Sequence, residues 1–275
     1  MNEITIEAGR AERQYWHDLW RYRELFYFLA WRDILVRYKQ TVIGIAWAVI
    51  RPLLTTIVLT VVFGKMAKMP SNGIPYTLLV FCGLLPWQFF ATAFSESGNS
   101  LVSNSGMISK VYFPRLVVPA SSIITSFVDF LISSVILAGI MIYYHFTPYH
   151  YTPGVGIVFL PVFILLAFAT AFASGLWISA LMVRYRDFRY IVPFVVQFGL
   201  YLSPVAFTSN VVPAEWRLLY SVNPMVGVID GFRWTVLGET MYWPGFYISM
   251  GVVFFLIVSG IWYFRKTERT FADVI

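Results

Sequence analysis

The chain has 275 residues, of which 59% are hydrophobic and only 12% are charged, whereas a soluble domain carries about 25% charged residues. Because a water-soluble core cannot bury so much apolar surface, the composition excludes an ordinary soluble protein and indicates an integral membrane protein. The single Cys82 excludes an internal disulfide and a cysteine-based zinc site. The net charge of +6 comes from residues in short segments between apolar runs, which is typical of membrane-topology signals and not of a nucleic-acid surface.

Residues 1–41 are polar, basic and aromatic, and we expect them to form a cytoplasmic N-terminal segment. No long apolar run precedes Val42, so the first span is predicted to act as an uncleaved signal anchor. Aromatic and apolar residues recur about once per helical turn from Tyr15 to Tyr38, with arginines between them. This pattern predicts an amphipathic interface helix in the headgroup plane, and the alternative is a soluble helix packed on a partner protein.

A helix needs about 20 mostly apolar residues to cross a bilayer. The predicted fold is therefore an all-α integral membrane domain over residues 42–264, followed by a cytoplasmic tail over 265–275. Most of the 20 lysines and arginines fall in segments that this topology places in the cytoplasm, together with both termini. The six predicted transmembrane helices cover residues 42–64, 76–95, 117–144, 155–183, 190–208 and 245–264.

Two charged residues lie inside predicted spans. Arg51 lies in the first span, and it either snorkels to the cytoplasmic surface, which we favour, or pairs with Asp129. Asp129 shares one face of the third span with three serines, and an aspartate near mid-membrane costs about 2.5–3.5 kcal/mol on insertion scales. We therefore expect Asp129 to face protein or water, as an interhelical clasp in preference to a proton relay or pore residue.

The fourth span carries a small residue at every fourth position, a spacing that lets another helix approach closely. This stripe serves either packing within the chain or dimerisation. Its members are Ala167, Ala171, Gly175 and Ser179.

Nearly forty residues separate the fifth and sixth spans on the predicted outer side. Two short amphipathic pieces occur there, Ala214–Tyr220 and Val226–Leu237, and both are too short or too polar to cross a bilayer. They are rich in apolar residues, so we expect two short re-entrant helices that cap an external vestibule.

The connection between the second and third spans, residues 99–119, begins with polar residues and ends at a proline. A helical piece over Met107–Phe113 is predicted to face the cytoplasm. No phosphate-binding G-x-x-x-x-G-K-[ST] loop occurs in the sequence, so any ATP that drives transport is hydrolysed by another polypeptide.

The six residues Lys-Val-Tyr-Phe-Pro-Arg at 110–115 resemble a motif of the ABC-2 type permeases that export lipid-linked polysaccharide, such as O-antigen and capsule. Further matches to that family follow in the family's order over essentially the whole chain. They are Arg37–Gln40, Gly44, Trp47, Arg51-Pro52, Arg186–Arg189, Ser203–Val205, Asn223-Pro224 and Phe232-Arg233.

The resemblance implies a homodimer in the bacterial inner membrane with two copies of a separate ATP-binding-cassette ATPase. That subunit would bind ATP and Mg, and no cofactor, metal or nucleic acid is expected on this chain. The residues that would dock in the ATPase are Met107, Ile108, Ser109, Lys110, Val111 and Tyr112.

The channel for the lipid-linked polysaccharide would lie along the dimer interface, where aromatic rings could stack on sugars. Our candidates for its lining are Trp47, Phe194, Phe198, Tyr201 and Tyr220.

Three other functions compete with polysaccharide export. An ABC-2 exporter of drugs or small hydrophobic molecules would share the architecture. A membrane enzyme acting on lipid-linked sugars would need clustered acids or histidines, and the outer segments offer only Glu215, Asp230 and Glu239. A proton-driven carrier would use Asp129 and would not need ATP.

Overall fold

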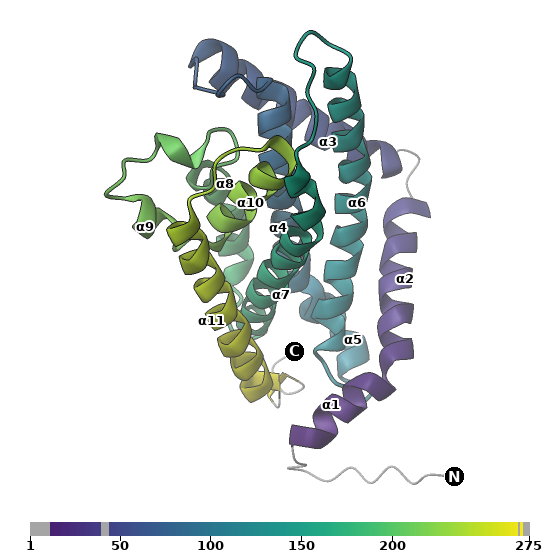
Figure 1. The fold of residues 1–275 in the computed structure, drawn as a ribbon. Coiled ribbons are helices and arrows are strands. Elements are labelled where there is room, and N and C mark those ends of the chain that lie inside the picture. Colours follow the sequence, from purple (N-terminus) through teal and green to yellow (C-terminus); the bar gives the residue numbers. More distant parts are fainter. Residues whose placement is uncertain (1–11, 40–43, 269, 272–275) are drawn as a thin grey trace.

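The computed structural model describes residues 12–39, 44–268 and 270–271, and within these ranges the chain forms helices and turns but no strand. The predicted all-α fold is confirmed. Figure 1 shows α4, α6, α7 and α11 running along the long direction of the molecule, whereas α3 crosses them obliquely. The helices are α1 Glu12–Arg21, α2 Arg23–Lys39, α3 Gly44–Leu59, η1 Thr60–Met66, α4 Tyr76–Ser103, α5 Ser105–Ile108, α6 Val117–His145, η2 Val155–Phe159, α7 Leu160–Arg184, α8 Phe188–Leu202, η3 Ser209–Val211, α9 Arg217–Tyr220, α10 Pro224–Leu237 and α11 Trp243–Glu268.

Five helices in the described part of the chain are long and apolar enough to cross a membrane, one fewer than the sequence predicts. They overlap the predicted first, second, third, fourth and sixth spans. The predicted fifth span, 190–208, corresponds to α8, which has 15 residues; at 1.5 Å per residue it is about 22 Å long. The helix ends at Leu202 because Ser203 is extended (φ −100°, ψ 152°), as favoured for a residue that precedes a proline such as Pro204.

Helix α4 is the centre of the bundle, and most of its residues are buried against α6, α7 and α10. The small-residue stripe of α7 lies on its buried face, with Ala167, Ala171 and Ser179 fully buried. A Cβ atom on Gly175 would lie 2.7 Å from Oγ of Ser97 in α4. The stripe therefore serves close packing within the chain, since a larger side chain at these positions would separate α7 from α4.

The predicted single helix from Tyr15 to Tyr38 is instead two helices, α1 and α2, that meet at Tyr22. Helix α1 lies obliquely across one end of the bundle, whereas α2 runs along α6 (Figure 1). Leu29 and Ala30 of α2 are buried against the bundle, and Trp31 is exposed. The segment is therefore amphipathic because one of its faces packs against the rest of the chain.

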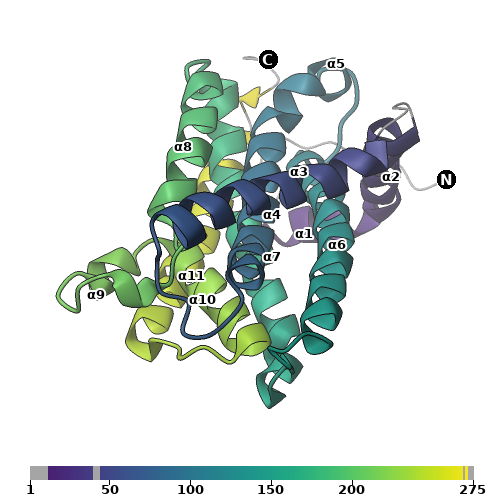
Figure 2. The same ribbon diagram turned by 90° about the horizontal axis from the view of Figure 1, so that it is seen from above.

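Between α8 and α11 the chain folds into short elements at the opposite end of the bundle from α1 (Figures 1 and 2). The predicted piece 214–220 is helical only over Arg217–Tyr220, whereas the second predicted piece corresponds to α10. Helix α10 begins with a cap, because the Asn223 side chain accepts a hydrogen bond from the Met225 amide at 3.0 Å. It ends at Gly238, whose φ of 70° suits glycine. Its residues are mostly buried against α4, α7 and α11.

Candidate functional site

The segment predicted to dock in an ATPase lies at the same end of the bundle as α1 and the C-terminal end of α11 (Figure 1). Its helical part is the single turn α5, followed by a turn in which the Val111 amide donates to the Met107 carbonyl at 3.0 Å. The predicted helix Met107–Phe113 is therefore shorter and earlier than expected. Met107 is half-buried, Ile108 and Phe113 are buried, and the four residues from Ser109 to Tyr112 are exposed.

We call these four exposed residues the tip. Buried apolar residues on both sides of the tip hold it in place, because Ile108 and Phe113 belong to one core cluster with Leu29 of α2 and Phe264 of α11. The Tyr22 hydroxyl adds a hydrogen bond to the Tyr112 carbonyl at 3.3 Å. The tip is thus an exposed turn whose two ends are anchored in the core of the chain.

A charged cluster joins α2, α4 and α6. Nη1 of Arg37 lies 2.5 Å from Oδ2 of Asp129. The Tyr38 hydroxyl donates to the other Asp129 oxygen, and Nη2 of Arg37 pairs with Glu96 of α4. Asp129 therefore faces protein, and its described partner is Arg37 and not Arg51, whose side chain is exposed.

The serines that share the Asp129 face do not bind this carboxylate. Ser122 donates to the Pro119 carbonyl at 2.8 Å, within its own helix. Sequence reasoning missed Arg37 as the partner. The signal was present, since an aspartate in a span needs a cation or a donor and the Arg37-Tyr38 pair precedes the first span.

Replacing Asp129 by Asn should lower the stability of the chain modestly and leave ATP-driven export largely intact. The amide keeps a hydrogen-bonding oxygen, and Arg37 keeps Glu96 as a second partner, so losing the partly buried ion pair should cost about 1.5–3 kcal/mol. Thermal unfolding in detergent and export in cells measure the two effects, with the exposed Asp187 changed to Asn as the stability control. Loss of export with normal assembly would instead indicate that Asp129 acts directly in transport.

The predicted channel aromatics fall into two groups. Trp47 on α3 and Phe194, Phe198 and Tyr201 on α8 are each at least half exposed. Tyr220 on α9 is half-buried, so it does not share their surroundings. The structure therefore places four of the five candidates on faces that no described part of the chain covers.

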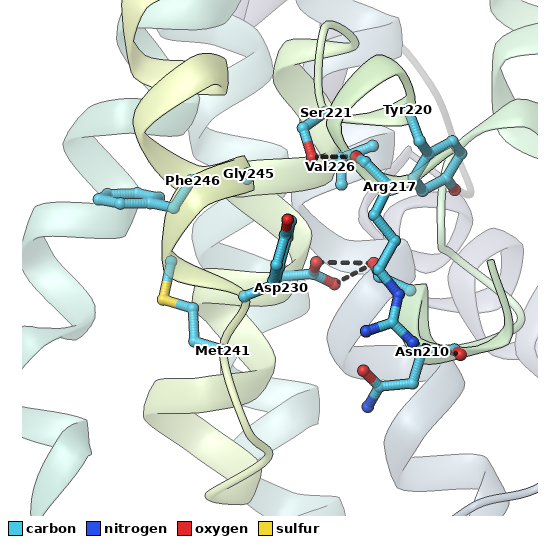
Figure 3. A pocket seen from close by; sticks show the side chains of 12 residues that line it. Asn210, Arg217, Tyr220, Ser221, Val226, Asp230, Met241, Gly245 and Phe246 are labelled. Carbon is cyan, nitrogen blue, oxygen red and sulfur yellow. Dashed lines mark hydrogen bonds between the residues drawn. The ribbon is translucent and has the colours of Figure 1, made fainter. Parts of the chain in front are cut away.

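A small polar pocket lies between α9, α10 and the start of α11, toward the end of the bundle opposite α1. The Ser209 hydroxyl donates to the Asp230 carboxylate at 2.6 Å. In Figure 3 the Arg217 guanidinium lies beside Asn210, on the side of the pocket opposite Phe246. Desolvation raises the pKa of Asp230, although the Ser209 hydrogen bond and the charge of Arg233 act in the opposite direction.

Several polar groups of this pocket bind the chain itself, whereas the buried Tyr220 hydroxyl has no hydrogen-bond partner among the described residues. Arg217 donates to the carbonyls of Asn210 and Val212, both at 2.9 Å. The described residues contain no group of three or more His, Cys, Asp or Glu side chains that could hold a metal ion. These contacts hold the segment between α8 and α10 in position.

Arg233 of α10 is fully buried, which the sequence did not indicate. Its guanidinium donates to the carbonyls of Phe207 at 2.7 Å and Val205 at 2.8 Å, with a longer contact to Leu79 of α4 at 3.4 Å. A Cβ atom on Gly83 would lie 2.8 Å from Nη2 of Arg233, so glycine leaves room for the guanidinium. Arg233 thus ties the extended segment after α8 to α4 and α10.

The sequence profile of the ABC-2 type transporter family matches residues 24–237, which is more than half of the chain. The chain belongs to this family. The residues that match the family include the charged cluster, the tip and Arg233, whereas α11 lies beyond the match.

Several characterised proteins are similar to the ABC-2 chain at modest identity. The O-antigen export system permease protein RfbA of Klebsiella pneumoniae is 26% identical over 89% of this chain and 92% of its own length. The protein of the same name from Myxococcus xanthus is 25% identical over 78% of this chain and 81% of its own length. The polysialic acid transport protein KpsM of Escherichia coli is 21% identical over 80% and 81%.

Proposed function

We propose that the chain is the membrane-spanning permease subunit of an ATP-driven exporter that moves lipid-linked polysaccharide, of the O-antigen or capsule type, across the bacterial inner membrane. The observation that carries this proposal is that relatives from three organisms, each aligned over at least 78% of the chain, bear the names of O-antigen or polysialic acid transport proteins. The alignments cover between 81% and 92% of the length of those relatives, so the likeness extends over most of each permease.

ATP is hydrolysed by a separate subunit, present in two copies, which binds ATP and Mg. The absence of a phosphate-binding loop from the sequence and the exposed tip support this division of labour. In this scheme the tip from Ser109 to Tyr112 touches the ATPase, while the buried Ile108 and Phe113 pass its movement to the bundle.

In our proposal the functional unit is a homodimer, and the exposed apolar faces of α3 and α8 are the surface that the second copy covers. Residues such as Leu54 and Val58 on α3 and Phe198 on α8 are at least half exposed. An apolar cavity of about 250 Å³ lies between the ends of these two helices, lined by residues that include Leu59 and Tyr201. A second copy placed against α3 and α8 would cover these faces and enclose a path between the two chains.

The exposed aromatics of α3 and α8 would line that path. Aromatic rings stack on the C–H faces of sugars without selecting a single register. A row of such rings therefore lets a long glycan slide, whereas one tight site would hold it. Trp47, Phe194, Phe198 and Tyr201 are the residues we place along the path.

The membrane topology has six crossings, with α8 and the extended segment after it forming the fifth. Both termini are cytoplasmic, α1 lies at the cytoplasmic interface, and α9 and α10 are the re-entrant helices at the outer end. In support, α1, the tip and the C-terminal end of α11 share one end of the bundle (Figure 1), where their apolar side chains form one cluster.

Deleting the chain from its host should remove the surface polysaccharide and cause lipid-linked glycan to accumulate inside the cell. The wild-type chain should restore the surface polymer only in the presence of a partner ATPase with an intact phosphate-binding loop. Immunoblots of surface glycan and analysis of lipid-linked intermediates measure the two pools. Normal surface polysaccharide in the deletion strain, together with sensitivity to small hydrophobic compounds, would instead identify a small-molecule exporter.

A further inference from the structure

The C-terminal end of α11 forms hydrogen bonds with the chain just after the tip. The Arg115 amide donates a hydrogen bond to Oε1 of Glu268 at 2.7 Å, and the Arg115 guanidinium donates to the Glu268 main-chain carbonyl. These contacts join residues 153 positions apart in the sequence. The segment that leaves the tip is therefore fastened to the last helix as well as to its neighbours in sequence.

Apolar and cationic contacts close around this joint. Phe271 is buried and meets Phe264 edge to face, with ring centroids 5.4 Å apart. Both rings belong to the cluster that contains Ile108 and Phe113 on either side of the tip. The guanidinium carbon of Arg265 lies 4.3 Å from the Tyr15 ring centroid, so α1 joins the same assembly.

The other end of α11 is fastened to the short outer helices. The Ser249 hydroxyl donates to the Ser221 carbonyl at 2.8 Å. A Cβ atom on Gly227 of α10 would lie 2.6 Å from the Ser249 Cβ, so α10 and α11 touch closely there. Helix α11 therefore connects the surroundings of the tip with α9 and α10.

We propose that Glu268, with Arg115, is a positioning pair that transmits movement of the tip into α11 and so to the outer helices α9 and α10. The proposal rests on the proposed function, in which the tip receives force from an ATPase. A partly buried amide donor bound to a carboxylate resists displacement more than apolar contact does, because separating the two removes a charge-assisted hydrogen bond. A second route leads from the tip directly into α4 and α6, which flank it in sequence, and does not require Glu268.

Two reporter positions distinguish these routes. The measurements use the complete transporter, that is the permease with its ATPase, in proteoliposomes. Leu219 on α9 and Tyr143 near the outer end of α6 are 62% and 65% exposed. Each is replaced singly by Cys in a chain whose buried Cys82 is changed to Ala. The rate of modification by a water-soluble maleimide is then compared without nucleotide and with the ATPase trapped by ATP and vanadate.

We expect the modification rate at each position to change by about fivefold on trapping. Glu268→Ala should largely remove the change at position 219, and the double variant with Arg115→Gln should abolish it. Both variants should leave the change at position 143. Glu268→Gln should retain both responses, because its amide oxygen can still accept from the Arg115 amide.

A response at position 219 that survives in the double variant would overturn the proposal, and so would simultaneous loss at both positions. Wild-type chains that bind no ATPase, with no response at either position, would overturn the proposed function itself. Co-purification of the ATPase with each variant distinguishes these outcomes.

Discussion

Replacing Lys110 and Tyr112 together by Ala should reduce polysaccharide export by about tenfold or more while leaving the chain folded and inserted. Both side chains are exposed, and the Tyr112 side chain is 64% exposed. The hydrogen bond that Tyr112 accepts from Tyr22 uses the main chain and survives the substitution. The variant therefore removes contact surface without removing packing. Export, ATP hydrolysis by the complex and thermal unfolding are the measurements.

A matched control lies at the opposite end of the bundle. Lys65 and Tyr149 are also exposed, and their double replacement by Ala should leave export unchanged. Export at the wild-type level in the Lys110 and Tyr112 double variant would contradict the docking role of the tip. Modification of a cysteine in the tip by a membrane-impermeant reagent added outside intact cells would contradict the proposed topology.

Replacing Arg233 by Met should destabilise the chain by about 2–6 kcal/mol, the cost of two buried acceptors left without a donor. The side chain is fully buried, and its loss would leave the carbonyls of Phe207 and Val205 without their donor. Each unsatisfied buried acceptor costs about 1–3 kcal/mol. We expect a lower thermal midpoint and less chain in the membrane, measured by fluorescence-detected size exclusion after heating.

Two further variants test the cause. Arg233→Lys keeps the charge but lacks the planar fork that reaches two carbonyls, so its loss of stability should be intermediate. Arg217→Gln removes two hydrogen bonds to carbonyls in a more exposed loop, and it should cost about 1 kcal/mol. Equal effects of Arg217→Gln and Arg233→Met would show that burial of Arg233 does not set its contribution.

The departures from the predicted elements have local causes that the apolar pattern conceals. Residues 190–208 form a continuous apolar run, yet the helix ends at Leu202 because Ser203 precedes a proline. The recurring aromatics from Tyr15 to Tyr38 predict one surface helix, but Leu29 and Ala30 bury one face of α2 against the bundle. An amphipathic pattern shows that one face is apolar without showing whether lipid or protein covers it.

Some features of the candidate site could likewise be predicted from the sequence, and others could not. Three of the four exposed tip residues, Lys110 to Tyr112, fall in the sequence motif at 110–115, and their docking role stays a prediction. The sequence could not show that Glu268 holds Arg115, or that Arg37 reaches Asp129 from 92 positions away. Contacts at such separations depend on how helices pack.

The sequence by itself determined the helical membrane class, the approximate position of most long helices and the family resemblance. The first two follow from the free energy of transferring each segment into a bilayer, which depends on the composition of that segment alone. The resemblance follows from the order of short motifs along the chain. Only the tertiary structure decided the partner of Asp129, the burial of Arg233 and the joint between Arg115 and Glu268. A charged group in a low-dielectric interior is stable only beside a partner, and packing of distant helices decides which partner lies within reach.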